Sequence, residues 1–198
     1  MGGCSAASDV YKGQLPAGLV SVPCLDRIAP DNDLAGCHLE NMVRLVLGLP
    51  CLAPCTPAGV MELLKRYQLS PKGKKAVVIG RSNIVGKPLS IMLSAKGDYA
   101  DATVTLCHSR TPDLPSFTRS ADFLFVAMGN PGFLRGDMVK QGAVVIDVGI
   151  SVTEKGLQGE CDFASVGKVA SALRPVPGGV GPRTIAMLRK NTLQEFVS

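Results

Sequence analysis

Residues 76–88 read Ala76-Val77-Val78-Ile79-Gly80-Arg81-Ser82-Asn83-Ile84-Val85-Gly86-Lys87-Pro88. A short run of β-forming residues ends at a glycine, and a loop with a second glycine leads into a helix opened by proline. Gly80 permits a sharp turn, Gly86 permits close packing of the helix, and the helix N-terminus is expected to offer free N–H groups to a phosphate. The loop departs from Gly-x-Gly-x-x-Gly because Ser82 takes the middle position. A strand-turn-helix without a ligand has the same pattern.

The hydrophobic pattern around this loop predicts alternating strands and helices. Buried strands are predicted over residues 76–79, 102–107, 123–127 and 144–148. Helices are predicted over residues 56–68, 88–95 and 182–196, the first with Thr56 as its N-cap and Pro57 at its first position. Strands separated by helical crossovers form parallel βαβ units. The predicted fold is therefore α/β, with a doubly wound, Rossmann-type, mostly parallel sheet.

The composition narrows the class of protein. The net charge of +5 suits an anionic ligand, and a general surface bias would give the same value. The sequence has no basic run and no interleaved aromatic residues of the kind that bind nucleic acid. It also has no apolar run that approaches the roughly 20 residues needed to span a membrane. Seven cysteines and no secretory signal favour a reducing compartment, the cytoplasm or alternatively the mitochondrion. The distant His38 and His108, with no Cys-x-x-Cys pair, predict no metal site.

The end of the second predicted strand bears on which dinucleotide would bind. A site for NAD usually has Asp or Glu there, which holds the ribose hydroxyls. This chain has His108-Ser109-Arg110 instead. Together with Arg81 across the loop, these side chains could hold a 2′-phosphate, which favours NADP. A solvated turn is the alternative interpretation of the same three residues.

Several motifs in order resemble one known family. They are Pro54-Cys55-Thr56-Pro57, the loop from Gly80 to Pro88, Ala102-Thr103-Val104-Thr105, Val145-Ile146-Asp147-Val148-Gly149-Ile150, Pro175-Val176-Pro177-Gly178-Gly179-Val180-Gly181-Pro182 and Asn191-Thr192-Leu193. The chain is similar to the methylenetetrahydrofolate dehydrogenase/cyclohydrolase family from about Gly18 to its end. The proline- and glycine-rich run from Pro175 to Pro182 is the most specific of these motifs.

The resemblance implies a two-domain enzyme of one-carbon metabolism and purine biosynthesis, usually a homodimer. Such an enzyme oxidises 5,10-methylenetetrahydrofolate with NADP and hydrolyses the methenyl product to 10-formyltetrahydrofolate. The cofactor contacts that it implies are Gly80, Arg81, Ser82 and Ile150, with Ser109 and Thr56 as lesser candidates. The segment implied to line the folate side of the cleft is Pro175, Val176, Pro177, Gly178 and Gly179, for which a rigid turn that opens the last helix is the alternative.

By the same resemblance, the chain divides into three parts. Residues 1–54 correspond to a remnant of an N-terminal α/β folate and catalytic domain. Residues 55–174 form the Rossmann domain that binds NADP. Residues 175–198 comprise the folate-side loop and a C-terminal helix that packs back on the N-terminal part.

The chain departs from the family where catalytic residues are expected. The family's Tyr-x-x-x-Lys helix has no counterpart, because Tyr11 and Lys12 are adjacent. Ser21 stands where the family has glutamine, and Ala35 where it has an aspartate that grips the pterin. The catalytic residues are therefore unassigned, and a missing general acid or base typically costs about 10²–10⁴ in rate. These departures indicate a fragment, a degenerate copy or an engineered variant.

Three functional hypotheses follow. The first is the family enzyme with impaired turnover, and the second is a non-catalytic module that binds NADP or forms dimers. The missing lysine, Ser21 and Ala35 favour the second for activity, whereas the intact C-terminal motifs favour the first. A third hypothesis, an NAD-dependent oxidoreductase of another kind, leaves the segment from Pro175 to Pro182 unexplained.

Overall fold

The computed structural model describes residues 29–153, 156–174 and 178–197. Its centre is a parallel sheet with the strand order β2-β1-β3-β4-β7. The strands are β1 (Lys75–Ile79), β2 (Thr103–Cys107), β3 (Phe123–Val126), β4 (Val144–Asp147) and β7 (Ala172–Arg174). The chain leaves β1 toward β2 on one side and later returns to β3 on the other. The order of the strands therefore reverses at β1, where doubly wound sheets bind their ligands.

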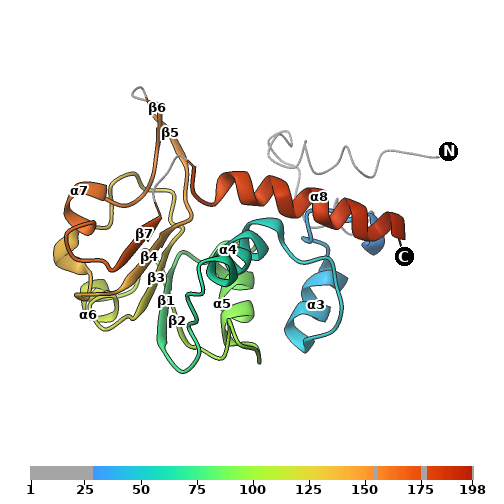
Figure 1. Ribbon diagram of the computed structural model, residues 1–198, viewed down its shortest axis with the longest axis horizontal. Coiled ribbons are helices and arrows are strands. Elements are labelled where there is room, and N and C mark those ends of the chain that lie inside the picture. The colour runs from blue at the N-terminus through green and yellow to red at the C-terminus, as the bar shows by residue number, and fades with distance from the viewer. Residues whose placement is uncertain (1–28, 154–155, 175–177, 198) are drawn as a thin grey trace.

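Helices cover both faces of this sheet (Figure 1). On one face lie α4 (Cys55–Arg66) and α5 (Gly86–Ser94), and on the other lie η3 (Gly136–Met138), α6 (Leu114–Thr118) and α7 (Phe163–Val166). Successive residues of a strand point to opposite faces, so Ala76 and Val78 join one core and Val77 and Ile79 the other. Burial on both faces explains why these strands are continuous apolar runs.

The C-terminal helix α8 (Gly181–Val197) runs along α4 and away from the sheet (Figure 1). Its contact with α4 is close, because a Cβ on Gly59 of α4 would lie 3.3 Å from Arg183. Further along α8, the buried Asn191 donates from Nδ2 to the carbonyl oxygens of Leu34 at 2.8 Å and Ala53 at 3.1 Å. These bonds attach the end of α8 to the segment that precedes α4.

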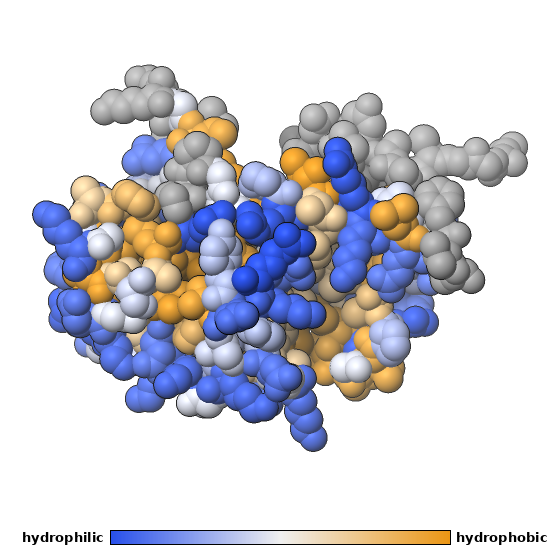
Figure 2. Space-filling model, in the orientation of Figure 1, coloured by the Kyte–Doolittle hydropathy of each residue, from blue (hydrophilic) through white to orange (hydrophobic). Residues whose placement is uncertain are grey.

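That preceding segment contains η2 (Pro30–Asn32) and α3 (Leu39–Leu47). His38 is the N-cap of α3, because its Nδ1 accepts the N–H of Glu40, and Gly48 ends the helix with φ +70°. The outer surface of α3 bears exposed apolar side chains, including Val43, Val46 and Leu47. Apolar surface is visible in the region of α3 in Figure 2.

A small antiparallel hairpin stands apart from the main sheet (Figure 1). It consists of β5 (Ser151–Thr153) and β6 (Gly156–Gln158), paired with each other alone. The hairpin joins the end of β4 to α7, and its return strand is soon followed by Glu160, which contacts the backbone after β3. Within the described ranges, no helix has the length and apolar character needed to cross a membrane.

The α/β fold and the four predicted strands are confirmed, each within a residue of its predicted ends. The prediction that Thr56 caps its helix is wrong, because α4 begins at Cys55 and Pro54 is the N-cap residue. Thr56 lies in the first turn, where its Oγ1 accepts the hydroxyl of Thr184 at 3.2 Å. The helix begins two residues earlier than the Thr-Pro pattern indicates, and Pro57 fits in its first turn because the N–H groups there have no partner within the helix.

Candidate active site

A cavity of about 550 Å³ lies where the carboxyl ends of the central strands meet. The loop after β1 contributes Ser82, Ile84 and Val85, and the ends of β3 and β4 contribute Ala127, Gly129, Val148, Gly149 and Ile150. Opposite these strand ends, Thr56 of α4 and Thr184 and Ile185 of α8 complete the wall. The cavity therefore occupies the position at which a doubly wound sheet binds its ligand.

Two glycines hold the loop after β1 against the neighbouring strand. Gly80 has φ +123°, and a Cβ there would collide with the backbone carbonyl of Ala127. A Cβ on Gly86 would collide with the carbonyl group of Gly80. The turn and the close approach that the sequence suggested for these two glycines are both present, because only a residue without a side chain fits at either position.

The side chain of Ser82, between these glycines, binds backbone N–H groups at the start of α5. The Ser82 hydroxyl accepts the N–H groups of Val85 at 3.1 Å and Gly86 at 3.3 Å, and its carbonyl accepts that of Lys87 at 3.1 Å. The prediction of free N–H groups at the start of α5 is therefore wrong. A side-chain oxygen has taken the place that an anion would need. A phosphate at this loop must displace the hydroxyl or bind earlier in the loop.

The residues expected at the 2′-phosphate lie on the rim, outside the lining of the cavity. The N–H of Gly80 donates to the carbonyl of Cys107 at 2.9 Å, which joins the ends of β1 and β2. Arg81 and Ser109 are both exposed just beyond these ends. The turn that carries Ser109 is ordered locally, since the Nδ1 of His108 accepts the N–H of Arg110 at 3.2 Å. Two adjacent strand ends thus bring an exposed cation and a hydroxyl to the same edge of the sheet.

The structure describes only part of the predicted folate side. Pro175, Val176 and Pro177 lie outside the described residues, as does Ser21. Gly178 is exposed with φ +92°, and Gly179 is buried and accepts a bond from Arg183 at 3.3 Å. Val180 and Gly181, the next two residues, line the cavity beside α8.

The position of Ala35 lies in a turn between η2 and α3. Its carbonyl accepts the N–H of Cys55 at 3.2 Å, and its side chain is a methyl group that is half-buried. Asp33 beside it is buried, and its Oδ2 accepts the N–H of His38 at 2.6 Å and the Nδ2 of Asn41 at 3.1 Å. Oδ2 of this carboxylate holds the turn in shape, whereas its buried Oδ1 has no hydrogen-bond partner among the described residues.

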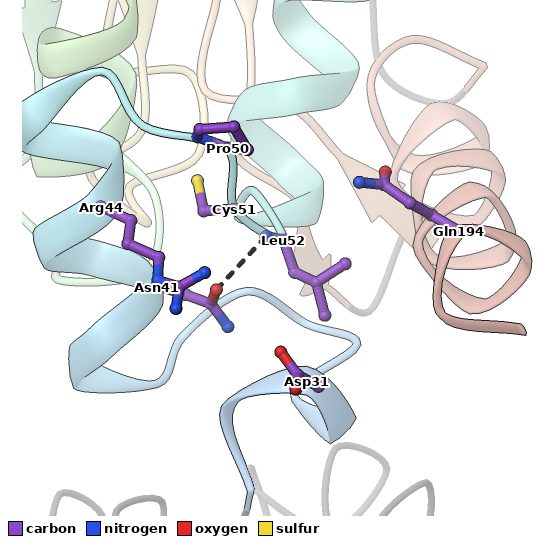
Figure 3. A pocket seen from close by; sticks show the side chains of 7 residues that line it. All are labelled: Asp31, Asn41, Arg44, Pro50, Cys51, Leu52 and Gln194. Carbon is purple, nitrogen blue, oxygen red and sulfur yellow. Dashed lines mark hydrogen bonds between the residues drawn. The ribbon is translucent and has the colours of Figure 1, made fainter. Parts of the chain in front are cut away.

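A second, smaller cavity of about 180 Å³ lies beside this turn, between α3, the segment before α4, and α8 (Figure 3). Arg44, Asn41, Asp31 and Gln194 give it polar walls. The oxygen of Asn41 already accepts the N–H of Leu52 at 3.3 Å, and the Arg44 guanidinium already pairs with Glu40. Two of its polar side chains are thus engaged within the protein.

Two buried carboxyl groups at the large cavity were not found from the sequence. Glu160 lines the cavity and is 1% exposed, and its oxygens accept the N–H groups of Met128 at 2.6 Å and Gly129 at 2.7 Å. Asp147 at the end of β4 accepts the N–H of Cys161 at 2.8 Å. Its Oδ1 has no hydrogen-bond partner among the described residues. Asp147 could have been noticed as an acid that ends an apolar strand, whereas Glu160 follows a hairpin and gives no such signal.

Burial is the largest influence on the pKa of both carboxyl groups. It raises the pKa of Glu160, the two N–H groups lower it, and neighbouring Asp147 raises it. Burial likewise raises the pKa of Asp147, and bonds from Cys161 lower it. The Cys161 thiol between them also has a raised pKa, first because it is buried and then because Asp147 is near. The three residues form a compact titratable cluster, in which Glu160 lines the cavity and Asp147 and Cys161 lie outside its lining.

Comparison with known proteins identifies the family. Residues 54–198 match the family model described as "Tetrahydrofolate dehydrogenase/cyclohydrolase, NAD(P)-binding domain". The chain belongs to this family. The "Bifunctional protein FolD" of Nitratidesulfovibrio vulgaris (strain DP4) is 63% identical over 182 residues, which are 92% of this chain and 64% of that protein. The protein of the same name from Desulfovibrio desulfuricans is 58% identical over 98% of this chain and 69% of its own length.

Solved structures agree with this assignment. The bifunctional FolD enzyme of Campylobacter jejuni superposes with a TM-score of 0.87 at 48% identity, over 91% of this chain and 64% of that one. The Trypanosoma brucei enzyme, solved with NADP cofactor and inhibitor, superposes with a TM-score of 0.84 at 39% identity, over 92% and 65% of the two chains. This chain thus spans less than two thirds of the length of several relatives that it matches.

Proposed function

We propose that this chain binds NADP as part of an enzyme that oxidises 5,10-methylenetetrahydrofolate and hydrolyses the methenyl product to 10-formyltetrahydrofolate. The observation that carries the proposal is the cavity at the point where the strand order reverses, lined by the loop that the close contacts of Gly80 and Gly86 hold in place. The family match over residues 54–198 and the NADP-bound relative from Trypanosoma brucei support the same cofactor.

The residues present fit a dinucleotide that lies across the strand ends with its 2′-phosphate near β2 and its nicotinamide near β3 and β4. Arg81 and Ser109 on the rim would take the 2′-phosphate, and the loop at Ser82 would lie under the pyrophosphate. The nicotinamide half would then extend over Gly129 and Ile150, which line the cavity on the other side of β1. Bound NADP would accept a hydride, and this chain would contribute orientation and exclusion of water rather than a nucleophile.

The remaining predictions belong to the same proposal. The folate is expected against the segment from Pro175 to Gly179, and the three-part division of the chain, the homodimer and the cytoplasmic location stay predictions. One observation favours a second candidate, a module that binds NADP without turnover. Ala35 presents a methyl group where an aspartate is expected, and Oδ2 of its buried neighbour Asp33 is engaged in the turn.

Two measurements on the full chain separate the candidates. The first titrates NADP against the protein, and the second follows NADPH absorbance with methylenetetrahydrofolate and NADP. Binding together with NADPH formation supports the enzyme. Binding without NADPH formation supports the module, and the absence of binding refutes both. The matched control is NAD, which lacks the 2′-phosphate and is expected to bind more weakly.

A further inference from the structure

Glu160 is a buried carboxylate in the wall of the large cavity, held by two successive backbone groups. Its Oε2 accepts the N–H of Met128 at 2.6 Å, and its Oε1 accepts the N–H of Gly129 at 2.7 Å. Gly149 packs closely against this carboxylate, because a Cβ there would collide with Oε1 of Glu160. Because Gly149 leaves this space, the ends of β3 and β4 form a fitted seat for the carboxylate.

If the chain binds NADP as proposed above, the order of the strands determines which part of the cofactor would face the Glu160 carboxylate. The 2′-phosphate would lie at the end of β2 and the pyrophosphate at the loop after β1. Since the order is β2-β1-β3-β4, the remaining half of the dinucleotide must extend over the ends of β3 and β4. That half carries the nicotinamide ring, and the seat of Glu160 lies at those two strand ends.

The ring changes its charge in the reaction. The nicotinamide ring carries one positive charge in NADP⁺ and none in NADPH. Burial raises the pKa of Glu160, and the short N–H bonds that both of its oxygens accept oppose this effect and favour the ionised carboxylate. The neighbours that share its surroundings are the Asp147 carboxyl on β4 and the Cys161 thiol. No basic side chain of the described residues contributes to its pKa shift, so an oxidised ring would be the cation that this carboxylate meets.

We propose that Glu160 is a positioning residue with two effects: it fixes the backbone of Met128 and Gly129 in the cavity wall, and its charge favours NADP⁺ over NADPH. The first effect acts on both cofactor forms alike, because the wall contacts either ring. The second acts on the cation alone. The ratio of the two dissociation constants therefore isolates the charge from the structural role.

The test measures the Kd of NADP⁺ and of NADPH separately for the wild-type chain and for Glu160→Gln. Glutamine keeps the size of the side chain and removes its charge. The ratio Kd(NADP⁺)/Kd(NADPH) is expected to rise about threefold to thirtyfold, because the neutral amide no longer attracts the positively charged ring. The control is Glu62→Gln on α4, which neutralises a carboxylate that pairs with Arg66 outside the cavity lining. Its ratio is expected to stay that of the wild type.

Glu160→Asp keeps the charge on a shorter side chain, so both cofactor forms should bind more weakly with an unchanged ratio. If Glu160→Gln does not fold, the pH dependence of the wild-type ratio decides. The ratio should rise as the pH falls and the carboxyl groups of Glu160 and Asp147 take up protons. A constant ratio across pH, or the same ratio in Glu160→Gln and wild type, overturns the inference while leaving cofactor binding intact. A wild-type chain that binds neither form would overturn the proposed function instead.

Discussion

Gly80→Ala is expected to be among the most damaging single-methyl additions in the loop after β1. The new Cβ would meet the carbonyl of Ala127, which directly follows β3, and the residue would keep φ +123°. A non-glycine residue in such a conformation costs about 1–3 kcal/mol. Forcing an additional methyl group into packed backbone costs a further ~1–3 kcal/mol. The free energy of unfolding should therefore fall by about 2–6 kcal/mol.

Gly142→Ala is the matched control. Gly142 also has positive φ, at +80°, but a Cβ there would have no neighbour within 4 Å. Only the unfavourable backbone conformation should destabilise this variant. The difference between the two changes in the free energy of unfolding therefore estimates the effect of the collision with Ala127. Gly142 precedes β4 at the opposite end of the sheet from the cavity. NADP affinity should consequently be reduced by Gly80→Ala and unchanged by Gly142→Ala.

Urea unfolding and thermal unfolding measure the loss of stability. In a chain of this size, Tm is expected to fall by about 2–4 °C for each kcal/mol. Titration with NADP measures the functional term. Equal destabilisation by the two alanines would refute the close approach between the loop and β3. Full NADP affinity in a folded Gly80→Ala protein would refute the placement of the cofactor over this loop.

Four further changes test other parts of the structure. Arg81→Ala should weaken NADP by about 10- to 100-fold, the range for a charge-assisted bond, and weaken NAD much less; equal weakening in a titration would contradict the 2′-phosphate role. Asn191→Ala removes the amide donor from the Ala53 carbonyl and leaves the Leu34 carbonyl with the Cys55 thiol, so it should cost about 1–3 kcal/mol in urea unfolding, whereas a neutral result would show that water replaces the amide. The Lys140 ammonium lowers the pKa of Asp122, so this pair stabilises the fold above the ordinary pKa of aspartate and its contribution disappears as the pH falls through the lowered value. Lys140→Ala should therefore cost under about 1 kcal/mol at neutral pH and nothing in acid, and a cost independent of pH would point to packing instead. Burial raises the pKa of Asp147, so its contribution is present below the ordinary pKa and disappears as the pH rises through the raised value; Asp147→Asn should reduce that loss in melting curves across pH, and an unaltered pH profile would exclude Asp147 as its source.

The elements that the sequence predicted well are those whose signal is local. The strands β1 and β3 are buried on both faces, so each is a continuous apolar run that can be recognised without its neighbours. Strand β7 could not be recognised, because Ala172–Arg174 is only three residues long and becomes a strand by pairing with β4. The hairpin β5–β6 is equally short, and α3 lies in a stretch whose prolines and glycines favour irregular structure.

The candidate site divides in the same way. The roles of Gly80 and Gly86 were predictable because the geometry of a turn depends on residues that are close together in the sequence. The cap at Ser82 was misjudged, since a hydroxyl at that point serves a phosphate loop and a helix cap equally well. Glu160 was missed because its partners Met128 and Gly129 lie 32 and 31 residues earlier in the chain. No spacing rule relates residues that only the crossover between β3 and β4 brings together.

Ser82 and Glu160 share a property that bears on how the site would recognise its ligand. Each is a side-chain acceptor that engages two backbone N–H groups at the cavity, one at the start of α5 and the other after β3. The wall is therefore held in shape at these two places by the protein's own oxygens, and these four N–H groups are already engaged. In the proposed complex, Arg81 and Ser109 on the exposed rim would supply side-chain contacts to the 2′-phosphate. Discrimination between dinucleotides would then depend on the rim, and discrimination between redox states on the charge of Glu160.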